Sequence, residues 1–93
     1  MDKRVAYEEK LAAQLEEWKA QLALLKAKAD KATAEAKIEY CNATEALRNK
    51  YEEARMKLQE LKDASDGTWE EIKRSTEKAW TEVKNAFHGA DSK

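Results

Sequence analysis

Apolar residues recur along this chain at a spacing of eleven residues. When the sequence is divided every eleven residues from Leu11, three positions in each block are mostly apolar. The most regular of these positions is the fourth, which holds Gln14, Leu25, Ala36, Leu47, Leu58, Trp69 and Trp80. Three apolar positions per eleven residues give a period of about 3.67, close to the period of an α-helix. The pattern therefore predicts nearly straight amphipathic helix rather than the left-handed supercoil of a strict heptad.

The first helix is predicted to run from about residue 3 to residue 64. The chain contains no proline, and neither of its two glycines lies in this range. The weakest part is residues 26–37, which contain no large apolar side chain. Alanine is the best helix former, so we expect the helix to continue through this segment. The alternative is an additional turn near Asp30, which would give three shorter helices.

A break in the helix is predicted at residues 65–67. Gly67 suits the left-handed conformation that often ends a helix. Thr68 and Glu71 have the spacing of a capping box, in which two side chains satisfy amide groups at a helix start. We therefore expect a second helix over about 68–88. Because the eleven-residue spacing continues across the break without a shift, a kinked continuous helix is the competing interpretation.

A turn this short predicts that the second helix folds back antiparallel against the first, as a helical hairpin. The side chains that would pack across the hairpin are Leu47, Tyr51, Leu58, Leu61, Trp69, Ile72, Trp80, Val83 and Phe87. The predicted fold is thus all-α, with one domain over residues 1–93 and a disordered tail at 89–93.

The first half of the long helix carries a further apolar stripe, which the hairpin would leave uncovered. Its residues are Tyr7, Leu11, Leu15, Trp18, Leu22 and Leu25. Burying one leucine or tryptophan contributes about 1.5–3 kcal/mol, and large exposed apolar patches usually mark interfaces. We therefore predict self-association through this stripe, as an antiparallel coiled-coil dimer or a tetrameric helical bundle. In the three-helix alternative the same side chains are covered within one chain, and the protein is a monomer.

Composition and charge exclude several classes of partner. Charged residues make up 40% of the 93 residues, yet the formal net charge is only −1. This balance leaves no basic stripe for a nucleic acid, so no nucleic-acid partner is expected. No apolar run is long enough for a signal peptide or a membrane span, which predicts a cytoplasmic protein.

Groups that could carry catalysis are scarce. The single histidine, His88, lies near the C-terminus, and the glutamate pairs are adjacent residues, which do not face each other on a helix. The sequence has no cysteine and histidine cluster for zinc and no glycine-rich phosphate-binding motif. We predict no enzyme activity, no catalytic or metal-binding residue and no cofactor. The single cysteine, Cys41, is interpreted as a small half-buried apolar residue rather than a redox switch.

The tryptophans allow a second interpretation. Trp18, Trp69 and Trp80 could anchor an amphipathic helix at a lipid surface, since lipid-binding helices also separate an apolar face from a charged one. The apolar face is narrow here, and long stretches of it contain only alanine. Packing between helices is therefore the preferred role.

Four segments of the sequence resemble a family of small bacterial coiled-coil proteins. They are YEEKLAAQLEEWKAQLALLKAKADKATAEAKIEY, ARMKLQELKDAS, TWEEIKRSTEKAWTEVKNAF and a short tail rich in alanine, serine and lysine. The family was first described in cyanobacteria and is known for a link to stress responses. The resemblance implies a bacterial, cytoplasmic, helical protein, and it implies no catalytic residue and no ligand.

These observations together predict a non-enzymatic coiled-coil protein with a structural or protein-interaction role in bacterial stress. Its expected partner is a second copy of the chain, with an unidentified protein as a further partner. The alternative is an amphipathic protein that binds a lipid surface.

Overall fold

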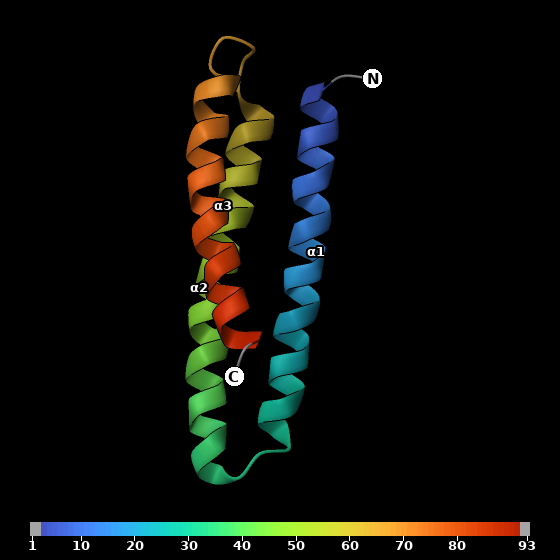
Figure 1. Ribbon diagram of the computed structural model, residues 1–93. Coiled ribbons are helices and arrows are strands. Elements are labelled where there is room, and N and C mark those ends of the chain that lie inside the picture. Colours follow the sequence, from blue (N-terminus) through green and yellow to red (C-terminus); the bar gives the residue numbers. More distant parts are fainter. Residues whose placement is uncertain (1–2, 92–93) are drawn as a thin grey trace.

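The computed structural model describes residues 3–91, which form three α-helices. Helix α1 spans Lys3–Asp30, α2 spans Ala34–Asp63 and α3 spans Trp69–Asp91. Successive helices are antiparallel and pack against each other, so α1 and α3 run in the same direction and share α2 as a neighbour (Figure 1). The fold is all-α, with three helices in an elongated bundle of 52 × 21 × 20 Å.

The long first helix predicted over residues 3–64 is wrong, because α1 ends at Asp30 and α2 begins at Ala34. The three-helix alternative, with its turn near Asp30, is the arrangement that the structure has. Thr33 is the N-cap of α2: its backbone is extended (φ −64°, ψ 164°), and its Oγ1 accepts a hydrogen bond from the amide of Ala36 at 3.4 Å. The break lies in the segment without large apolar side chains. A continuous helix would gain little from packing there, whereas folding back buries the apolar stripe of α1.

The connection between α2 and α3 covers residues 64–68, at the predicted break. Ala64 is extended (φ −68°, ψ 142°), and its amide donates to the carbonyl of Leu61 at 3.2 Å. The carbonyl of Ser65 accepts hydrogen bonds from the amides of Thr68 (3.1 Å) and Trp69 (2.9 Å). The chain therefore reverses direction after an extended Ala64, and helix-like hydrogen bonds to Ser65 follow.

Two details predicted for this connection are wrong. Gly67 is not left-handed, since no glycine in the described range has a positive φ. Thr68 and Glu71 do not form a capping box. The amide of Thr68, which Glu71 would have to cap, donates instead to the carbonyl of Ser65. The hydroxyl of Thr68 donates to that same carbonyl at 3.3 Å.

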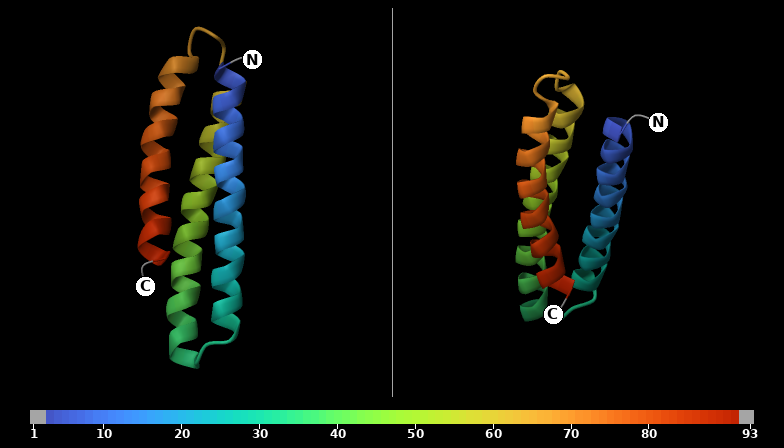
Figure 2. Two further views of the ribbon diagram at one scale, coloured as in Figure 1. Left: turned by 45° about the vertical axis from the view of Figure 1, so that its right-hand side comes forward. Right: turned by 45° about the horizontal axis from the view of Figure 1, so that its top comes forward.

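The end of α3 also differs from the prediction. The helix runs to Asp91, three residues beyond the predicted end at residue 88. The predicted disordered tail at 89–93 is therefore wrong for its first three residues, and residues 92–93 lie outside the described residues. Even so, α3 ends before it reaches the connection between α1 and α2 (Figure 1; Figure 2, left).

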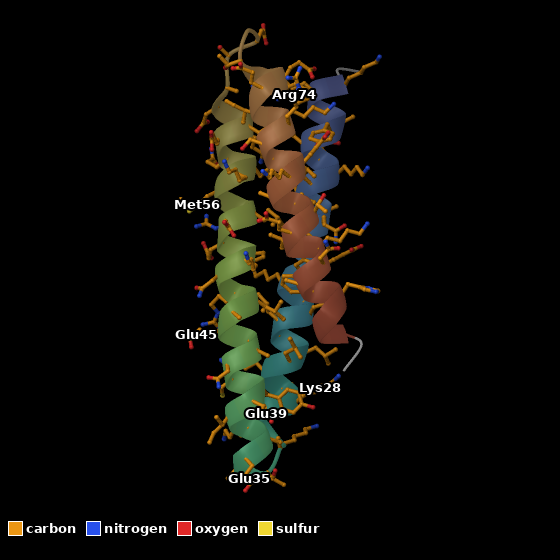
Figure 3. All side chains as sticks on the ribbon, turned by 60° about the vertical axis from the view of Figure 1, so that its left-hand side comes forward. Lys28, Glu35, Glu39, Glu45, Met56 and Arg74 are labelled. Atoms are coloured by element: carbon orange, nitrogen blue, oxygen red, sulfur yellow. The ribbon has the colours of Figure 1, made fainter. Side chains whose placement is uncertain are left out.

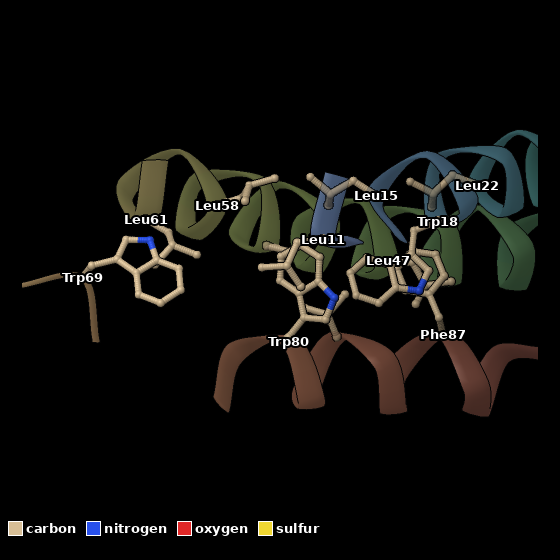
Figure 4. Close-up of a cluster of buried hydrophobic side chains, with 12 residues drawn as sticks. Leu11, Leu15, Trp18, Leu22, Leu47, Leu58, Leu61, Trp69, Trp80 and Phe87 are labelled. Atoms are coloured by element: carbon tan, nitrogen blue, oxygen red, sulfur yellow. The ribbon is translucent and has the colours of Figure 1, made fainter. Parts of the chain in front are cut away.

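One apolar core runs along the axis of the bundle, and all three helices contribute to it (Figure 4). Its buried members are Leu11, Leu15, Trp18, Leu22, Leu47, Ala54, Leu58, Leu61, Trp69, Trp80, Val83 and Phe87. The buried hydroxyl of Thr76 is satisfied within α3, because it donates to the carbonyl of Ile72 at 2.8 Å. Charged side chains cover the outer faces (Figure 3).

The side chains predicted to pack across the hairpin all lie in this core or against it. Of the nine, only Tyr51 and Ile72 are partly rather than fully buried. The pairing of the second half of the chain thus resembles the predicted hairpin. The difference is that α1 fills the third side of the core.

Candidate functional site

The interface between α1 and α3 varies along its length more than the other interfaces of the bundle. Both helices pack closely on α2, but their backbones approach each other little, and large side chains bridge the distance between them. Polar and aromatic contacts join the two helices near the start of each. Stacked aromatic rings join them near the end of α3. A groove lies between these two joined regions.

The first joined region is built around Arg4 and Glu8 of α1. One carboxylate oxygen of Glu8 accepts hydrogen bonds from Arg4 Nε (3.1 Å) and from the indole Nε1 of Trp69 (3.1 Å). The side chains of Arg4 and Glu8 are only 22% and 15% exposed. Arg4 also lies over the Trp69 ring, with its Cζ 5.7 Å from the ring centroid. We call Arg4, Glu8 and Trp69, together with Asp66, whose carboxylate also accepts a hydrogen bond from Arg4, the Arg4 cluster.

Arg4 also closes the C-terminal end of α2. Its Nη2 donates to the carbonyls of Ala64 (2.6 Å), Lys62 (3.1 Å) and Leu61 (3.4 Å). Its Nη1 donates to Asp66 Oδ1 at 3.1 Å. The last carbonyls of a helix have no amide partner within the helix, and a cation there also interacts favourably with the helix dipole. A single side chain near the N-terminus thus satisfies the end of a helix about sixty residues later.

Tyr7 extends this joined region toward the groove. Its ring meets Trp69 edge to face, with the centroids 5.8 Å apart. The ammonium of Lys73 lies over both rings, 4.9 Å from the Tyr7 centroid and 5.6 Å from that of Trp69. The Tyr7 hydroxyl donates to Glu77 Oε1 at 3.3 Å. Burial, the negative charge of Glu77 and this hydrogen bond together raise the pKa of Tyr7 from 10.0 to about 12.

The second joined region consists of three aromatic rings. Trp18 of α1 stacks on Phe87 of α3, with the centroids 5.4 Å apart. It also contacts Trp80, with the centroids 5.0 Å apart and the planes tilted by 39°. All three side chains are at most 9% exposed. Aromatic pairs of this kind contribute beyond the area they bury, so this region holds the end of α3 against α1.

The groove between the joined regions has a volume of about 370 Å³. Its lining residues are Tyr7, Lys10, Leu11, Gln14, Glu77, Trp80, Thr81 and Lys84. Leu11 and Trp80 are buried beneath it, and polar side chains form its walls. The side chains of Lys10 on the α1 wall and Lys84 on the α3 wall make no ion pair or hydrogen bond with another described residue. We call this feature the α1–α3 groove.

A second, smaller groove of about 250 Å³ lies between α1 and α2. It is lined by Lys19, Leu22, Ala23, Lys26, Arg48, Tyr51 and Glu52. Its charges are mainly positive as well. The helices on both sides of it are in close contact.

The rest of the described chain shows little that could carry chemistry. No group of three or more histidine, cysteine, aspartate or glutamate residues in residues 3–91 is arranged to hold a metal ion. His88 is exposed and carries no ring contact or ion pair with a described residue. Cys41 is an exposed free thiol, so its predicted half-burial is wrong. No helix within the described residues is both long and apolar enough to cross a membrane.

The residues predicted to mediate self-association lie inside the single chain. Leu11, Leu15, Trp18 and Leu22 are buried members of the core, and Tyr7 and Leu25 pack against it. The reasoning that this stripe has no partner within the chain is therefore wrong, because α2 and α3 cover it. Self-association itself stays a prediction, and it would need another surface or a rearrangement of the helices.

Sequence reasoning missed Arg4, Glu8 and Lys73. Arg4 and Glu8 are one helical turn apart, which could have indicated an ion pair, but the contacts of all three residues with Trp69 depend on the tertiary fold.

The comparisons with known proteins add no family: no family model matches the chain, and no curated protein or solved structure shows significant similarity to it. The resemblance to the bacterial stress family stays a prediction.

Proposed function

We propose that this chain is a non-enzymatic, cytoplasmic interaction protein that binds an amphipathic helix of a protein partner along the α1–α3 groove. The observation that carries the proposal is the pair of cations on opposite walls of that groove. Lys10 and Lys84 face a hollow of about 370 Å³ and have no partner among the described residues. A helix with glutamate or aspartate beside its apolar stripe would pair with both walls.

The direction of the bundle helices supports the same partner. Because α1 and α3 are parallel, a helix that lies between them and runs the opposite way would be antiparallel to both. That arrangement completes a four-helix bundle, a common and stable way of packing helices. Glu77 is also on the wall, but it already accepts a hydrogen bond from Tyr7, so the charges left for a partner are positive.

The test uses a labelled synthetic helical peptide of about 20 residues, with leucine on one face and glutamate beside it. We expect binding, measured by fluorescence polarisation, that weakens with salt. Lys10→Glu with Lys84→Glu should abolish it. The matched control is Lys62→Glu with Lys78→Glu, which makes the same charge change at exposed positions outside the groove lining. Equal binding of a peptide with lysine in place of glutamate, or no binding at all, would contradict the proposal.

A second candidate function is binding to a lipid surface. The observation that favours it is the segregation of α3, whose large apolar residues Trp69, Trp80 and Phe87 all lie in the core while its outer side is charged. Such a helix can lie in a membrane interface once it leaves the bundle. Vesicles of anionic phospholipid should then shift the tryptophan emission to the blue. An unchanged spectrum would leave the protein partner as the only candidate.

The resemblance stated above supports a setting in bacterial stress for this interaction. A strain that lacks the chain should then grow normally without stress and more slowly under it. Complementation by the Lys10→Glu, Lys84→Glu variant should fail if the groove carries the role. Equal growth of all strains under every stress applied would argue against this setting.

A further inference from the structure

We propose that the connection between α2 and α3 is a hinge at which two copies of the chain exchange α3. In the exchanged dimer, residues 64–68 become helical, so that α2 and α3 of each copy form one continuous helix. The α3 segment of each copy then packs on the α1–α2 pair of the other. The partner is therefore a second copy of this chain, and the docking surface is the one that α3 covers in the monomer.

The first observation is the register of the apolar residues. Leu47 and Leu58 in α2 and Trp69 and Trp80 in α3 follow one another at intervals of eleven residues, with no shift at the connection. A connection that only reverses the chain does not need to preserve this phase. If residues 64–68 were helical, the core residues of α2 and α3 would lie on one continuous face. The sequence is thus compatible with both the folded-back and the continuous form.

The second observation is that the connection is already close to helical. The amide of Trp69 donates to the carbonyl of Ser65 at 2.9 Å, which is the four-residue spacing of an α-helical hydrogen bond. Ala64 departs from helix mainly in ψ, which is 142° against about −42° in a helix. The chain contains no proline, and no described residue has a positive φ. A β-carbon added to Gly67 would meet no atom within 4 Å, so the surroundings of this residue are open.

The third observation is the competition for the carbonyls at the end of α2. In the monomer, Arg4 donates to the carbonyls of Leu61, Lys62 and Ala64. In a continuous helix the same carbonyls would accept the amides four residues further along the chain. Arg4 and the continuous helix therefore require the same acceptors. These three hydrogen bonds stabilise the folded-back form, and removing their donor favours the exchanged form.

Exchange also preserves the core. If α3 swings away alone, Trp69, Trp80, Val83 and Phe87 lose their cover, together with Trp18 on α1. An identical α3 from a second copy restores every one of these contacts. The balance between monomer and dimer then depends on the connection itself and on the protein concentration.

The test compares two glycine substitutions that have the same chemistry and different positions. Gly67→Ala increases the helix propensity of the connection, whereas Gly89→Ala does so near the end of α3, and neither new methyl group meets an atom within 4 Å. Residue 67 lies in a helix-like turn before α3 in the folded-back form and in a helix interior in the exchanged form, so alanine favours the exchanged form only by the difference between these two positions. The dimer contains two connections, so Gly67→Ala should tighten the dimer by a few-fold. Molar mass is measured by light scattering after incubation at high protein concentration. Gly89→Ala should behave as the wild type.

Two further variants change the equilibrium in opposite directions. Arg4→Ala removes the donor that stabilises the folded-back form, so its dimer fraction should rise. Gly67→Pro is incompatible with a helix through the connection, and the Gly67 amide donates to no described residue. That variant should remain a monomer at every concentration, also in combination with Arg4→Ala.

A distance measurement distinguishes exchange from ordinary association. Spin labels are placed at Asn49→Cys and Asn85→Cys in a Cys41→Ser background, and the labelled chain is diluted with unlabelled chain. Asn49 lies 15 residues before Ala64 and Asn85 lies 17 residues after Thr68, so in the monomer the antiparallel packing of α2 and α3 places both at a similar level of a bundle only 21 × 20 Å across. In a continuous helix, 36 residues separate them by about 54 Å. An Arg4→Ala, Gly67→Ala variant that stays a monomer at high protein concentration, or a dimer in which the short distance within one chain persists, would overturn the proposal.

The proposed peptide binding in the α1–α3 groove and the proposed exchange of α3 can be refuted independently of each other. Loss of peptide binding in the Lys10→Glu, Lys84→Glu variant says nothing about the connection, and exchange rebuilds the groove from two chains. Only the molar mass and the distance between the two spin labels of one chain therefore decide the proposal for the hinge.

Discussion

The indole ring of Trp18 lies stacked on the phenyl ring of Phe87, with the centroids 5.4 Å apart and the ring planes at 9°. The two residues belong to α1 and α3, whose backbones approach each other little. Each ring is 2% exposed. The stack therefore holds the last turns of α3 against a helix that it contacts mainly through side chains.

Truncating this stack should be among the most damaging changes to the protein. Phe87→Ala leaves a cavity beside Trp18, and the free energy of unfolding should fall by about 3–5 kcal/mol. That is a large part of the stability of a small domain. Denaturant titration followed by circular dichroism measures the loss. Met56→Ala, at a residue that is 66% exposed, should change stability by less than about 0.5 kcal/mol. Equal effects of the two substitutions would show that α3 does not pack as described.

Glu8 should contribute to stability through two hydrogen bonds at once. Glu8→Gln keeps the size of the side chain but removes the charge that faces Arg4 and Trp69, and the expected loss is about 1–3 kcal/mol. A double-mutant cycle with Arg4→Ala should show coupling, because the two residues share one network. Glu52→Gln, in the exposed pair with Arg55, is the control and should cost little. Additive losses in the cycle would contradict the shared network.

The break between α1 and α2 can be tested with proline. Ala34 is the first residue of α2 and is exposed, and Thr33 before it has the extended backbone that precedes proline readily. Ala34→Pro should leave the midpoint of thermal unfolding unchanged or raise it slightly. Ala46→Pro, in the middle of α2, should lower stability by about 3 kcal/mol or more. A loss at residue 34 as large as that at residue 46 would indicate a helix that continues through the break.

Tyr7 should make the protein less stable in alkali. Its pKa is raised to about 12 in the folded chain, chiefly by burial, against the usual 10.0. The unfolded chain therefore releases this proton first, so the contribution of Tyr7 is fully present below pH 10 and is lost as the pH rises to about 12. Tyr7 is only partly buried, so we expect a modest effect. Urea unfolding at a series of pH values should show a decline that is smaller in Tyr7→Phe. An identical decline in that variant would assign the effect to other groups.

The sequence predicted the helical class, the break at 65–67 and the side chains that line the second half of the core. These follow from local rules: the period of the apolar residues, the absence of proline and the position of glycine. The break after Asp30 was predicted only as an alternative. Alanine favours helix, and the local preference for continuing was outweighed by the packing gained when α1 folds back.

The candidate site was less predictable than the core. Lys10 and Lys84 are ordinary surface lysines in the sequence. They line the same groove only because α1 and α3 both pack on α2 and run in the same direction. Arg4 shows the same dependence, since its carbonyl partners lie about sixty residues away. Contacts between side chains so far apart in the chain carry no periodic signal, so no local rule could have placed them together.

By itself, the sequence determined which face of each helix is apolar, because the eleven-residue period keeps large side chains on one side of a helix. Only the tertiary structure decided what covers each face. The stripe from Tyr7 to Leu25 is the clearest case: its pattern is the same whether another chain or another part of this chain buries it. In the folded protein, α2 and α3 cover it, because the burial of apolar surface is non-directional and packing within the chain requires no second molecule.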